Sequence, residues 1–205
     1  MKVMNVAKAQ DIKDNTLRHL GTSVIYTVVT VVIFGLIYPF VFTLIAQVLF
    51  PWQANGSLVY VNGKPVGSAI IGQLWTKPQY FHGRPSAAGK GYDPTNTGGT
   101  NLGPTSKKLI DATKATIAAL AKENPDATVP VPMDLVTSSA SGIDPDISPQ
   151  AAYYQAPRVA KARNVPVAQV NALIARTIRP RMLGFLGEPR INVLQLNLAL
   201  DSQAR

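Results

Sequence analysis

Residues 83–91 are the part of this sequence that comes nearest to a nucleotide-binding loop. They read GRPSAAGKG, with Lys90 directly after a glycine. A phosphate-binding loop needs four residues between its two glycines, and a Ser or Thr after the lysine to hold Mg²⁺. Here five residues separate Gly83 from Gly89, and Gly91 stands in place of the Ser or Thr. The spacing therefore argues against a direct ATP site.

The other residues that could do chemistry are sparse. The chain has no cysteine, which excludes thiol catalysis and Cys-based zinc or iron–sulfur sites. His82 is the one histidine beyond the apolar segment, but no Gly-x-Ser-x-Gly elbow marks a serine partner for it. Asp144 and Asp146 could pair for acid–base or metal chemistry, although Asp-Pro-Asp before a helix is more typical of a turn. We expect no catalytic residue and no metal site.

A long apolar stretch precedes all of these residues. No Lys, Arg, Asp or Glu occurs between His19 and Lys64. A bilayer core takes about 20 apolar residues in a helix, whereas the apolar region of a cleaved signal peptide runs to only about 7–15. The sequence therefore predicts a retained transmembrane helix over residues 20–50, preceded by a cytoplasmic segment, residues 1–19.

The charges that flank the stretch predict its orientation. Lys2, Lys8, Lys13 and Arg18 precede it, and the first charged residue after it is Lys64. Because basic residues collect on the cytoplasmic side of a span, we expect the N-terminus in the cytoplasm and residues 51–205 in the periplasm.

The apolar stretch itself carries no ionisable side chain, and intramembrane charges are what mark ion paths and proton relays. One such helix cannot conduct an ion alone, so we expect an anchor or one wall of an assembly. Small residues let membrane helices approach closely, although they also occur in helices that face only lipid. The candidates for such packing are Gly21, Thr27, Gly35 and Ala46.

Residues 51–205 predict one mixed α+β domain. Asn62–Gly63 between two β-prone runs indicates a hairpin of residues 58–61 and 64–67, and residues 68–75 are expected to continue as a buried strand. Helices are expected over residues 104–124, over 149–163 behind the cap Ser148, and from Pro166 onward. The alternating leucines of residues 191–200 favour a strand, although Asn192 could instead cap a helix.

Between the hairpin and the first helix of this domain runs a long Gly- and Pro-rich segment, residues 80–106. A loop of this length in a compact domain is often functional, and glycines allow the close approach of another backbone. The alternative is a loop that only caps the helix after it. We expect a partner contact at Gly99, Asn101, Leu102, Gly103 and Thr105.

The net charge of +9 raises the question of nucleic-acid binding. The lysines and arginines are scattered, however, and no run is longer than Lys107–Lys108. A scattered positive surface is more typical of solubility, so we expect no nucleic acid as a partner.

Several segments resemble the family of C subunits of the Kdp potassium-transporting P-type ATPase. In chain order they are Gly72-Gln73, Tyr80-Phe81, Arg84-Pro85-Ser86, Asn101-Leu102-Gly103-Pro104-Thr105, Asp144-Pro145, Ile147-Ser148-Pro149, Glu188-Pro189-Arg190 and Asn192-Val193-Leu194. Through this resemblance Gln73 joins the residues expected to contact a partner.

The resemblance implies an accessory subunit of a high-affinity, ATP-driven potassium uptake complex in the inner membrane. Its partners would be a channel-like potassium-selective subunit and a P-type catalytic subunit, and a small single-span subunit is a further candidate. The family is described as a catalytic chaperone that raises the ATP affinity of the catalytic subunit. Since the expected topology separates this domain from cytoplasmic ATP, ATP and K⁺ would act through the complex. The alternative is a membrane-anchored periplasmic enzyme or binding protein.

Overall fold

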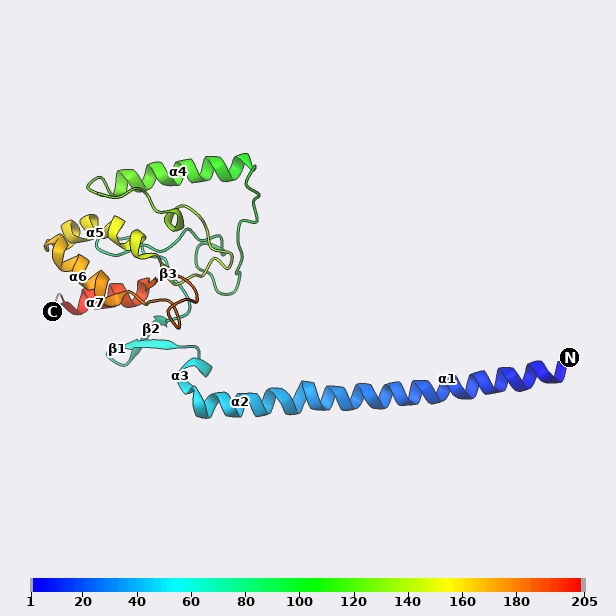
Figure 1. Ribbon diagram of the computed structural model, residues 1–205. Helices are drawn as coiled ribbons and strands as arrows, with labels where there is room; N and C mark the ends of the chain where they lie inside the picture. Colours follow the sequence, from blue (N-terminus) through cyan, green and yellow to red (C-terminus); the bar gives the residue numbers. More distant parts are fainter. Residues whose placement is uncertain (1, 204–205) are drawn as a thin grey trace. The chain divides into compact units, whose positions relative to one another are not determined.

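The structure, a computed structural model, describes residues 2–203, and the chain divides into two compact units between Gly56 and Ser57. The first unit is helical: α1 (Lys2–Thr30), a π-helical segment (Val31–Ile37), α2 (Tyr38–Leu49) and the short α3 (Pro51–Ala54). Figure 1 draws α1 and α2 as one unbroken ribbon from blue to cyan. Among the described residues one helix, Asn15–Leu49, is long and apolar enough to cross a membrane.

Pro39 lies inside this helix and does not end it. A proline has no N–H and therefore breaks the regular hydrogen-bond ladder of an α-helix. The turns before it are wound as a π-helix, and the N–H of Tyr38 donates to the carbonyl of Ile33, five residues earlier. Wider turns of this kind are a recognised way to carry a helix past an irregularity, and the helix continues to Leu49.

The second unit opens with the expected hairpin, β1 (Leu58–Val61) paired antiparallel with β2 (Lys64–Ser68). Asn62 and Gly63 both have positive φ, 51° and 75°, as a two-residue turn of this kind requires. The buried strand expected over residues 68–75 was wrong. Gly72 packs so closely against the Tyr92 ring that a side chain would not fit, and its N–H donates to the carbonyl of Ile143. Residues 69–75 are therefore irregular chain and pair with no strand among the described residues.

Four longer helices follow: α4 (Lys107–Glu123), α5 (Pro149–Arg163), α6 (Val167–Thr177) and α7 (Val193–Gln203). Helix α4 begins three residues later than expected from Pro104, with Ser106 at its N-cap position. Helix α5 starts as predicted, because the Ser148 hydroxyl accepts a hydrogen bond from the N–H of Ala151. Pro157 lies inside α5 without interrupting it.

The strand expected over residues 191–200 was wrong, and the alternative in which Asn192 caps a helix is confirmed. Only Ile191–Asn192 is extended, as β4, paired with β3 (Asp146–Ile147). The side-chain oxygen of Asn192 then accepts from the N–H of Gln195 and starts α7. The buried residues Val193, Leu196 and Leu200 recur at helical spacing, which outweighs the alternation of the leucines.

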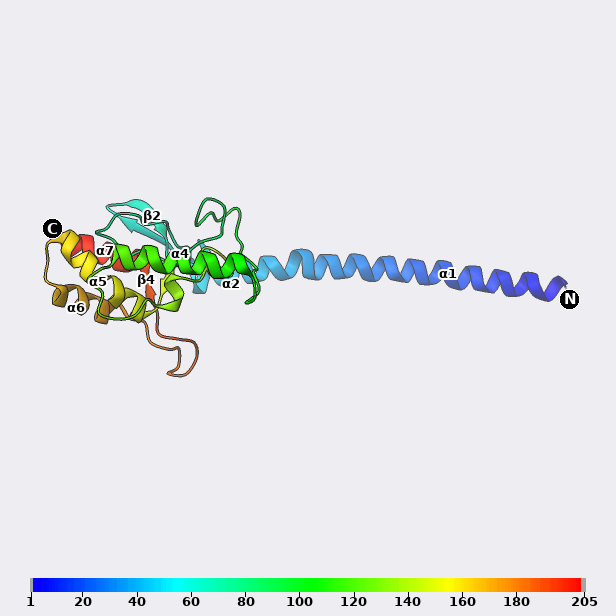
Figure 2. The same ribbon diagram turned by 90° about the horizontal axis from the view of Figure 1, so that it is seen from above.

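Helices α5, α6 and α7 enclose the core, with Phe81 and Ile147 packed against them, and Figures 1 and 2 both show these three helices close together. Helix α4 contributes no buried residue, and only Leu120 near its end packs against the core. The start and the end of the domain are joined directly. The N–H of Phe81 donates to the side chain of Asn197 (2.8 Å), and that side chain donates back to the Phe81 carbonyl (3.0 Å).

Candidate functional site

A buried polar cluster surrounds Arg158 on α5. Its Nε donates to the Asn124 side chain (3.0 Å), and its Nη1 donates to the carbonyls of Pro78 (2.6 Å) and Tyr80 (3.0 Å). Its Nη2 donates to Oε1 of Gln155 (2.7 Å). These bonds fasten the end of α4 and the chain around residue 80 to α5. These bonds use four of the five N–H donors of the guanidinium, which gives it a structural role.

His82 belongs to the same cluster. Its ring Nδ1 lies 3.0 Å from Oε1 of Glu123, and its Nε2 lies 3.1 Å from the carbonyl of Lys77. Its backbone N–H and carbonyl both bond the Gln155 side chain. The hydrogen bond from His82 lowers the pKa of Glu123, with burial acting against it. Both ring nitrogens of His82 are therefore engaged, one by the Glu123 carboxylate and the other by the Lys77 carbonyl.

Asp144 and Asp146 form the turn that their spacing predicts. One oxygen of Asp144 accepts from the N–H of Asp146 (3.1 Å), and the other pairs with Arg84 (2.9 Å). Asp146 pairs with Arg190 (3.1 Å), and burial raises the pKa of its carboxyl group. Among the described residues, no group of three or more His, Cys, Asp or Glu side chains is arranged to hold a metal ion.

Residues 83–92 wrap around Tyr92 and do not form an open cradle. The Tyr92 hydroxyl donates to the Arg84 carbonyl (2.7 Å), and burial raises the pKa of Tyr92 to about 12, with Asp144 adding to the effect. The N–H groups of Ala88 and Tyr92 both donate to the Ser86 hydroxyl. A phosphate cradle needs free backbone N–H groups, and those of Ala88, Gly91 and Tyr92 are bonded within the loop itself.

The loop residues expected to contact a partner lie together before α4. Asn101, Gly103 and Thr105 are exposed and Leu102 is half-exposed. Gly99 differs from them, because a Cβ added there would lie 3.1 Å from the carbonyl oxygen of Ala140.

Gln73 is placed elsewhere, since its Nε2 donates to the carbonyl of Val66 in β2 (2.8 Å). The structure therefore groups four of the expected contact residues on one exposed stretch. Gly99, in contrast, is packed against the backbone of Ala140, and Gln73 is hydrogen-bonded to β2 of the hairpin.

The four small residues expected to pack against partner helices all lie on the long helix. Gly21 has open space where a side chain would be, and Gly35 falls in the π-helical segment. The Thr27 hydroxyl donates to the carbonyl of Ser23 (2.8 Å), so it is satisfied within its own helix. Ala46 is half-exposed. Gly21, Thr27 and Gly35 are exposed among the described residues of this unit.

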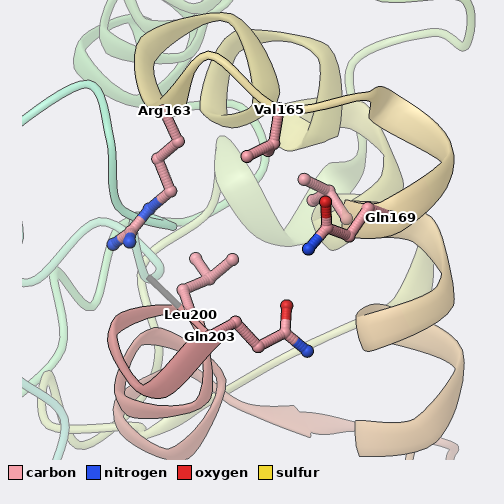
Figure 3. Close-up of a pocket in the computed structure, with 6 residues that line it drawn as sticks. Arg163, Val165, Gln169, Leu200 and Gln203 are labelled. Atoms are coloured by element: carbon pink, nitrogen blue, oxygen red, sulfur yellow. The ribbon is translucent and has the colours of Figure 1, made fainter. Parts of the chain in front are cut away.

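A small pocket of about 120 Å³ lies where α5, α6 and α7 meet, and Figure 3 shows its lining. Val165 and Leu200 line the pocket with apolar atoms, and the side chains of Gln169 on α6 and Gln203 on α7 line it with amide groups. Arg163 is already paired with Asp201 (2.7 Å). The pocket therefore presents amides and apolar carbon, without an unpaired charge to drive a reaction.

Two features were missed by sequence reasoning, the Arg158 cluster and a projecting hairpin over residues 179–190. Arg158 sits between apolar neighbours on a helix, and that position was the signal that could have shown its burial. The hairpin contains the apolar run MLGFL, which lies between Arg181 and Arg190. This run matches neither a two-residue turn motif nor a regular strand pattern, so the sequence did not indicate a hairpin here.

This chain is similar to known proteins over nearly its whole length. A family model described as "KdpC: K+-transporting ATPase, c chain" matches residues 20–202. The potassium-transporting ATPase KdpC subunit of Acidobacterium capsulatum is 55% identical over 185 residues, which cover 90% of this chain and 98% of that protein. The proteins of the same name from Koribacter versatilis and Caulobacter vibrioides are 52% and 53% identical, and the matches cover 90% and 91% of this chain and 94% of each relative.

Proposed function

The chain belongs to the KdpC family of K⁺-transporting ATPase subunits, and we propose that it is the non-catalytic accessory subunit of an ATP-driven potassium uptake complex. The family match over residues 20–202 carries this proposal. The domain's chemistry supports it, because the polar side chains that could have formed an active site are bonded to one another. His82, Arg158 and Gln155 hold the fold together.

The proposed topology is a single pass, with the N-terminus in the cytoplasm and the domain outside. Lys2, Lys8, Lys13 and Arg18 lie on the entry side of the helix, and no charged residue follows it before Lys64. The asymmetry of basic residues over short flanks sets orientation. A single-pass anchor in the inner membrane is the consequence.

The proposed partners are the channel-like potassium-selective subunit and the P-type catalytic subunit, with a small single-span subunit as a third. The outer domain would cover the mouth of the channel-like subunit. The exposed stretch Asn101, Leu102, Gly103 and Thr105 is the proposed contact, because it offers little side-chain bulk together with polar groups.

The proposed effect on ATP use is indirect. The domain would raise the ATP affinity of the catalytic subunit by stabilising one state of the assembly, which is a coupling free energy between distant sites. Two observations support this indirect route. The N–H groups of residues 88 and 92 are occupied within their own loop, and Lys90 follows a glycine spacing that does not fit a phosphate loop.

Co-purification from membranes tests the assignment. A tagged full-length chain should bring down two large polytopic subunits, and vesicles holding the whole complex should show K⁺-stimulated ATPase activity that falls when this chain is omitted. Recovery of the chain alone, with unchanged ATPase activity in its absence, would refute the accessory role.

Calorimetry with the full chain in detergent tests the absence of a direct ATP site. We expect no tight binding of ATP. Micromolar binding that disappears in Lys90→Ala would show a nucleotide site in the domain itself. Hydrolysis by the isolated chain that depends on His82 would favour the enzyme alternative.

A further inference from the structure

Residues 179–190 form an ordered hairpin that projects from the domain between α6 and β4. Arg179 and Arg190 exchange two backbone hydrogen bonds (2.8 and 3.1 Å), and Met182 and Leu186 exchange two more (both 2.9 Å). Figure 2 shows this segment, in orange-brown, extending away from the helices of the domain. The backbone pairing means that its end is held in a defined shape.

The end of the hairpin, residues 182–186, is apolar and exposed; we call it the hairpin tip. The exposed fractions are 64% for Met182, 79% for Leu183 and 69% for Phe185, and Leu186 is also exposed. Leu183 has a φ of 54°, which is uncommon for a leucine. A contiguous group of large exposed apolar side chains is typical of a surface that contacts a membrane or another protein.

The base of the hairpin is charged and fastened to the domain. Arg181 pairs with Glu188 across the two strands (2.6 Å), and Arg190 pairs with Asp146 (3.1 Å). Arg179 donates to the side chain of Gln195 in α7 (2.6 Å). Apolar side chains therefore occupy the outer end, and guanidinium groups lie behind them. A bilayer has the matching layers, with acyl chains below a headgroup region that accepts arginine.

The chain itself brings a bilayer within reach. Seven residues separate Leu49, the end of the helix able to span a membrane, from Ser57, the first residue of the domain. Eight extended steps of backbone reach at most about 30 Å, so the domain cannot leave the membrane surface. We propose that the hairpin tip inserts into the surface of the phospholipid bilayer that holds the chain's own helix. This inference rests on the proposed membrane anchoring.

The absence of cysteine allows a direct test on the full chain in vesicles of phosphatidylethanolamine and phosphatidylglycerol. A nitroxide is attached at Leu183→Cys in the hairpin tip, at Lys108→Cys on exposed α4, or at Phe34→Cys in the apolar helix. Collision rates with oxygen, which dissolves in lipid, and with a water-soluble nickel chelate report the depth of each label. We expect the label at 183 to lie about 5–10 Å into the boundary between headgroups and acyl chains, and the label at 108 to lie in water.

The outcomes separate the two proposals. A label at 183 that collides with nickel as freely as the label at 108, while 34 is protected, overturns tip insertion and leaves the anchoring intact. Nickel access at 34 overturns both.

A second variant and the whole complex make the test stricter. Adding Phe185→Asp to the labelled Leu183→Cys chain should move that label into water without changing the melting temperature, because Phe185 has no place in the core. A label at 183 that stays protected in this variant contradicts the proposal. So does a label that becomes shielded from both reagents only in the assembled complex, since a protein surface would then cover the tip.

Discussion

Arg158 binds residues from several separate segments of the domain. Its guanidinium group is buried and donates to Asn124, Pro78, Tyr80 and Gln155. Removing one member of a buried charged network leaves its partners unsatisfied, which costs about 3–5 kcal/mol. We expect Arg158→Met to lower the free energy of unfolding by that amount, measured by urea unfolding of the full chain in detergent.

Lys161→Met is the matched control, on the same helix. Lys161 and Asp126 form an exposed pair at 3.2 Å, and such pairs are worth about 0–1 kcal/mol. Equal losses in the two variants would contradict the structural role given to Arg158.

Glu123 predicts a pH dependence of known sign. The hydrogen bond with His82 lowers its pKa from the ordinary value of 4.5. A carboxylate with a lowered folded pKa stabilises the fold above its unfolded pKa, and the stabilisation disappears as the pH falls through the folded value. We expect Glu123→Gln to be less stable than the parent chain at neutral pH. The difference should shrink below about pH 4.5.

Asp146→Asn provides the comparison, because burial raises the pKa of Asp146. A carboxyl group with a raised folded pKa contributes stability below its unfolded pKa, and that contribution is lost as the pH rises. The stability difference for Asp146→Asn should therefore change with pH in the opposite direction. Melting curves of the full chain between about pH 3 and pH 8, which brackets both carboxyl groups, would show whether the two trends are opposite. Parallel trends would refute the assignment.

Among the elements, α5 and α4 differ in how they begin. The Ser148 hydroxyl accepts from the N–H of Ala151 and donates to Asp134 (both 3.0 Å). Ser106 stands at the same position of α4 without a side-chain cap bond. We expect Ser148→Ala to cost about 0.5–2 kcal/mol and Ser106→Ala clearly less. Thermal unfolding of both variants checks this, and equal costs would count against the cap.

The loop before α4 gives a second prediction for an element. A valine at Gly99 would press on the backbone of Ala140, whereas Gly103 has no neighbour within 4 Å of an added Cβ. We expect Gly99→Val to lower the melting temperature of the domain and Gly103→Val to leave it unchanged. If this loop is the partner contact, Gly103→Val combined with Leu102→Asp lowers K⁺-stimulated ATPase activity of the complex without unfolding the domain.

A normal level of assembly and activity in that double variant would assign the loop a purely local role. Gly99 is a poor probe of partner binding, because its effect on folding would mask an effect on assembly.

The elements also show where sequence reasoning works. The Asn62–Gly63 turn and the Ser148–Pro149 helix start were predicted, because each depends on local backbone chemistry. The strand expected over residues 68–75 does not form, because Gly72 packs against Tyr92 and Asp144, which lie much further along the chain. Arg158 was not assigned to the core, because its partners Asn124, Pro78 and Tyr80 come from distant parts of the chain. The family, in contrast, could be identified from short segments.

At the scale of the whole molecule, the long helix could serve only as an anchor, or it could also pack against the helices of other subunits. The described part of the chain leaves Gly21, Gly35 and Thr27 uncovered. We expect a chain whose residues 20–49 are replaced by poly-leucine to insert in the membrane but to co-purify less of the other subunits. Interhelical packing at small residues would then be lost while hydrophobicity is kept. Assembly equal to that of the parent chain would mean that association depends on the second unit alone, which begins at Ser57.

The bonds between Phe81 and Asn197 set an order of events during synthesis. These residues are 116 positions apart, and Asn192 similarly reaches back 123 positions to Ala69. A ribosome adds about 5–20 residues per second, so the first third of the domain waits roughly ten seconds for the helix that completes it. During that interval Phe81 and Ala69 lack the partners that Asn197 and Asn192 supply. The unfinished domain must therefore be protected until α7 is made, and a chain truncated before α7 lacks the side chain that binds Phe81.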